Sequence, residues 1–97
     1  MHGLLIEHRT LAGKRDDVKE IWEKFMKPAI AGNSGHAAYA YSFGNDEDVI
    51  VAFQVYQSKD DANAFLLKSE YRMYIEASRT LLAGEPKVTV LDVQWLK

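Results

Sequence analysis

The spacing of apolar residues changes several times along this chain, and the order of those changes constrains the fold more than any other feature. Alternation with a period of two, typical of half-buried strands, covers Gly3 to Arg9, His36 to Phe43, Asp48 to Tyr56 and Lys87 to Leu96. Helical spacing runs from about Arg15 to an end marked by Pro28 and Gly32, and from Ser58 to Leu82 with a break near Leu67. The predicted order is strand, helix, strand, strand, helix, strand.

This order predicts an α+β fold of the ferredoxin-like βαββαβ type. The four residues 44–47 have the length and composition of a hairpin turn, so the strands on either side should pair antiparallel. The two helical regions then act as crossovers, which gives a four-stranded antiparallel sheet with both helices on one face. The segment 48–56 is apolar on both faces, which favours a central position. A chain of 97 residues is expected to form a single domain over residues 1–97.

The face of the sheet away from the helices is expected to bind a second copy of the chain. Each strand carries apolar side chains on both of its faces, so this second face would otherwise be a large apolar patch in water. A homodimer formed through the sheet faces would cover the patch with an identical one.

Composition excludes several classes of function. The chain has no cysteine, which excludes disulfides, thiol nucleophiles and Cys-ligated metals. Twelve basic residues against fourteen acidic ones give a net charge of −2, which argues against a nucleic-acid partner. No apolar run approaches the length of a membrane span, and the first residues are too short an apolar run for a signal peptide. We therefore expect no membrane association and a cytoplasmic location.

Four short motifs, in order, carry a resemblance to a known family. They are Ala12-Gly13-Lys14 after the first strand, Gly35-His36-Ala37-Ala38-Tyr39, Gln54-Val55-Tyr56, and the helix break Leu67-Lys68-Ser69-Glu70-Tyr71. They are similar to the Pro-Gly-Lys, Gly-x-x-x-Tyr, Glu-x-Trp and Ser-Pro-x-Phe patterns of the antibiotic biosynthesis monooxygenase (ABM) family. The resemblance extends over nearly the whole chain and implies a dimeric α+β barrel.

The resemblance also implies a pocket between the sheet and the helices of each subunit. Members of the family include oxygenases of phenols and quinols that need no cofactor, as well as haem-degrading enzymes. This chain departs from the family pattern where Gln54 replaces a frequent Glu and where the region of Phe65 lacks a frequent His. The Asn, Trp and His of the haem-degrading branch are also absent, so haem is not the expected substrate.

His8 is the candidate catalytic residue. It lies at the end of the first strand on the face that carries Leu4 and Ile6, and imidazole can accept a proton from a phenol near neutral pH. The alternative is an ordinary half-exposed histidine bonded to a backbone carbonyl.

The candidate substrate-binding residues are mostly aromatic: Tyr71, Tyr74, Trp22, Phe65 and Arg79. The two tyrosines lie three residues apart on one helical face, where their hydroxyls could orient a ligand in an apolar cavity. The aromatic residues could equally be plain core. Arg79 could instead interact favourably with the C-terminal dipole of its helix.

The three histidines do not suggest a metal site. His36 is remote in sequence from His8 and begins a different strand, on the face of Ala38, Ala40 and Ser42 and opposite to Tyr39. No cofactor is expected. The function favoured by the sequence is a cofactor-independent monooxygenase of a small phenol-like or quinol-like aromatic. A small-ligand-binding or stress-related dimer without catalysis is the alternative, so enzymatic activity itself stays open.

Overall fold

The computed structural model describes all residues, 1–97, and its elements follow the predicted order. They are β1 (His2–Arg9), α1 (Arg15–Ala31), β2 (His36–Phe43), β3 (Val49–Tyr56), α2 (Lys59–Phe65), α3 (Ser69–Ser78), the short 3-10 helix η1 (Arg79–Leu81) and β4 (Lys87–Asp92). The second helical region is two helices because the chain turns at residues 66–68, where the break was predicted.

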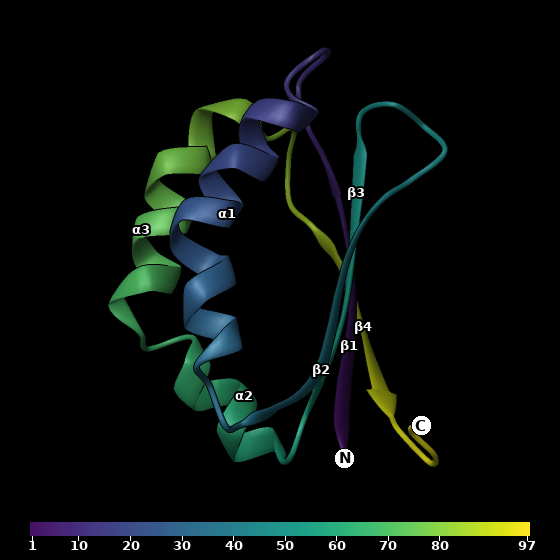
Figure 1. Cartoon of the computed structure of the whole chain (residues 1–97). Coiled ribbons are helices and arrows are strands. Elements are labelled where there is room, and N and C mark those ends of the chain that lie inside the picture. Colours follow the sequence, from purple (N-terminus) through teal and green to yellow (C-terminus); the bar gives the residue numbers. More distant parts are fainter.

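The strands form one antiparallel sheet in the order β2-β3-β1-β4. The helices all cover the same face, with α1 and α3 side by side (Figure 1). The predicted ferredoxin-like α+β fold is therefore correct, as is the central position of β3. None of the helices is long and apolar enough to cross a membrane.

Alternation along β1 and β3 decides which residues meet the helices. The face toward the helices carries His2, Leu4, Ile6 and His8 from β1 and Ile50, Ala52, Gln54 and Tyr56 from β3. The opposite face, which we call the open face, carries Leu5, Val51, Phe53 and Val55 among others. Polar Gln54 thus lies at an inward position of a central strand.

A β-bulge in β2 overturns one predicted placement. His36 pairs with Tyr56 and Ala38 with Val55, so Ala37 has no partner of its own. The extra residue shifts the alternation, and His36 comes to lie on the helix side together with Tyr39. The predicted placement of His36 opposite to Tyr39 is therefore wrong, because strict alternation was assumed across the irregularity.

Helix α1 continues through Pro28, which the sequence suggested as its end. A proline in the last turn removes one backbone hydrogen bond but can itself adopt helical angles. Pro28 is exposed, and its carbonyl accepts a hydrogen bond from the Gly32 N–H at 3.1 Å. The helix ends at Ala31, and Gly32 follows as its C-cap, as the sequence indicated.

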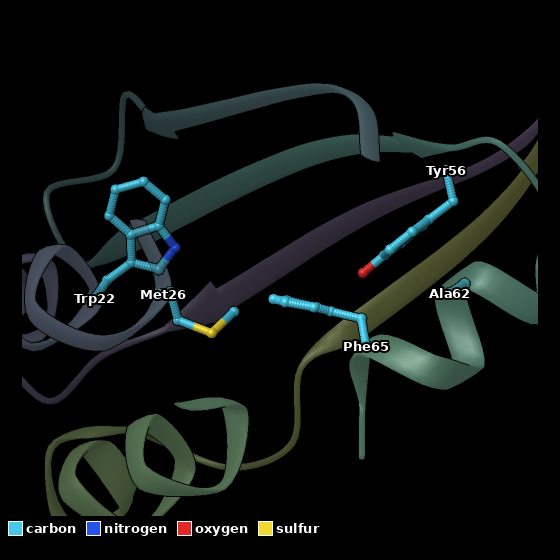
Figure 2. Packing of buried hydrophobic residues seen from close by; sticks show 5 residues of the cluster. All are labelled: Trp22, Met26, Tyr56, Ala62 and Phe65. Atoms are coloured by element: carbon cyan, nitrogen blue, oxygen red, sulfur yellow. The ribbon is translucent and has the colours of Figure 1, made fainter. Parts of the chain in front are cut away.

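The core lies between the helices and the sheet. Trp22 and Met26 project from α1 toward Tyr56 of β3 and Phe65 of α2, with Ala62 beside Phe65 (Figure 2). Val18, one turn before Trp22, has no exposed surface. The predicted helical stripe of α1 is thus the surface that faces the sheet.

Strand β4 ends at Asp92, earlier than the predicted end at Leu96. Asp92 pairs with His2, the first residue of β1, and the Val93 N–H makes one more hydrogen bond, to the Met1 carbonyl at 3.1 Å. After the end of β4, the Val93 side chain packs over Gly3. A Cβ atom at position 3 would lie only 2.7 Å from Val93 Cγ2. Trp95 is 79% exposed.

Ser58 caps α2, as the sequence predicted. Its Oγ accepts a hydrogen bond from the Asp61 N–H at 3.1 Å and donates one to Asp61 Oδ2 at 2.9 Å. We expect Ser58→Ala to lower the free energy of unfolding by about 1 kcal/mol, measured by urea denaturation. The matched control is Ser69→Ala, because α3 begins without a side-chain cap and should change by less than about 0.5 kcal/mol. Equal losses in the two variants would contradict this role of Ser58.

Candidate functional site

A cavity of about 370 Å³ lies between the sheet and the helices. β1 contributes Leu4, Ile6 and His8 to its wall, β2 contributes Tyr39 and Tyr41, and β3 contributes Gln54 and Tyr56. The helical side is formed by α1, α2 and α3 through large apolar and aromatic side chains. Pro86 and Val88 border the same end as His8, because Val88 pairs with Ile6 at the start of β4. The volume is suited to a small organic molecule.

Aromatic rings stacked on Trp22 form one wall of the cavity. The Trp22 and Tyr41 rings are stacked with centroids 4.1 Å apart, and the Trp22 Nε1–H donates a hydrogen bond to the Tyr39 hydroxyl at 3.3 Å. Burial raises the pKa of Tyr39 to about 12 and also raises the pKa values of Tyr41 and Tyr74. The phenol groups therefore stay protonated and able to donate hydrogen bonds at neutral pH.

The hydroxyl of Tyr41 is buried and has no hydrogen-bond partner in the chain. Tyr41 lines the cavity, so a bound molecule with a polar atom could supply the missing partner.

The charge of the cavity is low. Its lining contains no Asp, Glu, Lys or Arg, and His2 and His8 are its only histidines. No group of three or more His, Cys, Asp or Glu side chains is close enough to hold a metal ion. The lining thus offers neutral hydrogen-bonding groups within an apolar surface, which suits a neutral aromatic molecule with one or two oxygens.

His8 lines the cavity and is held by the loop before β4. Its Nε2 lies 3.3 Å from the Gly84 carbonyl oxygen. A carbonyl can only accept, so this contact places a proton on Nε2, and in the neutral ring the lone pair is then on Nδ1. Nδ1 is therefore the ring nitrogen that can accept a proton.

The other predicted binding residues separate into two groups. Trp22, Phe65, Tyr71 and Tyr74 all line the cavity. Arg79 does not: its guanidinium pairs with Glu76 at 3.0 Å on the exposed side of η1. The structure therefore does not bring Arg79 to the ligand, because the chain turns into η1 and directs this side chain outward.

Sequence analysis missed a polar cluster behind the cavity wall. The two ring nitrogens of His36 contact the side chains of Asn33 and Gln54, and the ring packs on Tyr56 with centroids 4.2 Å apart and edge-on against Phe65. Burial is the main cause that lowers the pKa of His36, so its imidazole is neutral at pH 7. The available signal was Gln54 itself, a polar residue in an otherwise apolar alternation.

Solved structures share this fold over nearly the whole chain. A candidate antibiotic biosynthesis monooxygenase from Nitrosomonas europaea aligns with a TM-score of 0.88 at 16% identity, covering 98% of this chain and 100% of that one. A candidate monooxygenase of the same name from Caulobacter crescentus aligns with a TM-score of 0.88 at 17% identity, covering 95% and 88%. A third, from Chloroflexus aurantiacus, has a TM-score of 0.77 at 24% identity and covers 97% and 95%.

No family model and no curated protein matches the chain. At the identities of the solved structures, the likeness establishes the fold. The resemblance to the ABM family that the sequence motifs indicated is therefore confirmed at the level of the fold.

The lowered pKa of His36 predicts a loss of stability in mild acid. The folded chain holds this proton less tightly than the unfolded chain, so acid favours unfolding. The contribution of His36 to stability should be complete above the unfolded value of about 6.5 and should decrease as the pH falls through the lower folded value. NMR titration of His36 in the native chain and in urea checks this. A native pKa equal to or above the value in urea would contradict the assignment.

Proposed function

We propose that this protein is a cofactor-independent monooxygenase that acts on a small aromatic substrate of the phenol or quinol type. The cavity carries the proposal: it is apolar, of suitable volume, lined by neutral phenol groups and bordered by one oriented imidazole at His8. The shared fold with candidate antibiotic biosynthesis monooxygenases supports it.

The chemistry requires only the substrate, dioxygen and a base. A phenol gives its hydroxyl proton to the base, and the electron-rich phenolate reduces dioxygen. A C–O bond forms at a ring carbon, that carbon loses its hydrogen as a proton, and the O–O bond breaks. The balance is phenol plus O₂ to quinone plus water, and the substrate supplies all four electrons. One oxygen atom enters the product and the other leaves as water.

His8 is the proposed base in this scheme. The Gly84 carbonyl holds the Nε2–H, so the lone pair on Nδ1 is available to accept the phenol proton. The same nitrogen can return the proton to the departing oxygen as water forms. The enclosed apolar wall keeps bulk water from competing for these steps.

A second candidate function is ligand binding without catalysis. It is favoured by the low charge of the cavity, where Gln54 stands in place of a carboxylate and the lining contains no Asp, Glu, Lys or Arg. A protein of this kind would bind the same neutral aromatics and leave them unchanged.

We further propose that the protein is a homodimer joined through its open face. The single chain exposes 6230 Å², whereas the scaling law for monomers of this mass gives about 5,600 Å². A continuous apolar row crosses this face from Ala40 through Phe53 to Leu5. A second sheet packed on the row would remove it from water.

Oxygen uptake with 1-naphthol, 2-naphthol and hydroquinone tests the catalytic proposal. We expect dioxygen consumption and, with ¹⁸O₂, one labelled atom in the product. His8→Ala should lower the turnover rate by about 10²–10⁴-fold, because that is the usual contribution of a general base. Circular dichroism should show that the variant stays folded.

His2→Ala provides the comparison, since His2 lies on the same face of β1 and also lines the cavity. A large loss of turnover in this variant, together with normal turnover of His8→Ala, would show that His2 and not His8 is the base. Saturable binding of the phenols without any oxygen uptake would remove the catalytic proposal and favour the ligand-binding function.

Phe53→Asp tests the dimer. A charge at the centre of the apolar row cannot be paired at a self-complementary interface, so we expect an 11 kDa species and lower solubility. Light scattering after size exclusion measures the mass. Met73→Asp is the matched control, because Met73 is a large exposed apolar residue on α3 and its replacement should leave the dimer intact. A native chain that is monomeric at micromolar concentration would contradict the proposed dimer.

A further inference from the structure

Three side chains form a continuous hydrogen-bonded line that ends at the cavity. Asn33, in the loop between α1 and β2, lies with Nδ2 2.7 Å from Nδ1 of His36. On the other side of the ring, Nε2 of His36 lies 3.0 Å from Oε1 of Gln54. Gln54 is only 6% exposed and lines the cavity. We call this line the Asn33–His36–Gln54 chain.

A backbone group sets the direction of every bond in this chain. The Gly35 N–H donates to Oδ1 of Asn33 at 3.4 Å, and a backbone N–H can only donate. The oxygen of the Asn33 amide therefore points toward Gly35, and the amide nitrogen points toward His36. Reversing the Asn33 amide would place two donors against each other at Gly35, so its orientation is determined.

The orientation of Asn33 then determines the tautomer of His36. Because Asn33 offers an N–H, Nδ1 of the ring must accept, and the single proton of the neutral imidazole lies on Nε2. Nε2–H must in turn donate to Gln54, which places the amide oxygen of Gln54 against the ring. The two N–H groups on the amide nitrogen of Gln54 are left without a partner in this chain.

We propose that Gln54 is the specificity-determining residue of the cavity, with its amide N–H directed by the Asn33–His36–Gln54 chain to donate to an oxygen acceptor on the ligand. Asn33 and His36 are positioning residues, since they act only through Gln54. The ligand class is an aromatic that bears a carbonyl or phenolate oxygen. The inference rests on the proposed function only in taking this cavity as the ligand site.

The physical reason for selectivity is the cost of leaving a buried donor unpaired. A ligand without an acceptor would displace water from the Gln54 N–H and offer nothing in return. An unpaired amide that could rotate would adapt to either a donor or an acceptor. Here rotation would break the bond to His36, so the site favours acceptors.

A hydrogen-bond donor at Gln54 also fits the proposed oxidation. A phenolate formed by loss of a proton to His8 is a stronger acceptor than the parent phenol, and a quinone product keeps a carbonyl at the same atom. A donor fixed in place before the ligand arrives would stabilise this oxygen without reorganisation.

Binding of 1-tetralone and of tetralin, which lacks the carbonyl, tests the proposal by titration calorimetry. We expect the native chain to bind 1-tetralone about fivefold more tightly than tetralin, which corresponds to one neutral hydrogen bond. Gln54→Met removes the donor at nearly constant volume and should abolish the preference. The infrared carbonyl stretch of bound 1-tetralone should shift to lower frequency in the native chain and lose that shift in Gln54→Met.

The matched control is Asn63→Leu. Asn63 is an exposed residue of α2 that also borders the cavity, but it has no hydrogen-bonded chain behind it, so its loss should leave the preference unchanged. If Asn63→Leu or Tyr41→Phe abolishes the preference while Gln54→Met keeps it, the donor is another group and the proposal is wrong. No saturable binding of 1-tetralone to the native chain also overturns it.

A measurement on the native chain decides the matter even if Gln54→Met does not fold. Long-range ¹⁵N–¹H correlation distinguishes a ring proton on Nε2 from one on Nδ1. A proton on Nδ1 of His36 would reverse the Gln54 amide and overturn the inference. Failure of the proposed oxidation alone would give a different result. In that case 1-tetralone would bind with the expected preference, but the phenols would consume no oxygen.

Discussion

The pairing of β1 with β3 is the constraint on which the rest of this structure depends. The two strands lie far apart in sequence but form the centre of the sheet, in register from His2 opposite Tyr56 to Arg9 opposite Val49. That register sends Leu4, Ile6 and His8 of β1 to the same side as Gln54 and the helices. α1 must then cross over this side to reach β2, and the cavity forms under the crossover.

The two faces of the sheet differ in the kind of contact they can make. The helix side combines apolar surface with neutral hydrogen-bonding groups, and its charged residues lie outside the cavity. The open face carries a row of apolar side chains without a polar partner group among them, from Ala40 to Leu5. The first arrangement suits a small molecule with a few oxygen atoms, and the second suits another apolar surface of the same shape.

The β-bulge at Ala37 connects the fold to the chemistry of the cavity. Without the extra residue, strict alternation would put His36 on the open face, away from Gln54. With it, the ring of His36 packs against Tyr56 and Phe65, and both of its nitrogens gain partners. One irregular residue therefore determines that the polar group at the cavity wall is an oriented amide with its donor free.

The sequence by itself determined the element order, the hairpin at residues 44–47, the cap at Ser58 and the apolar stripe of α1. Each of these depends on residues close together in the chain, whose spacing and turn chemistry are visible directly. It also placed His8, Tyr71 and Tyr74 on faces that meet the cavity. Only the tertiary structure decided the position of His36, the outward direction of Arg79 and the end of β4 at Asp92. These depend on where a partner strand ends or bulges, and on contacts between residues distant in sequence, which no local pattern records.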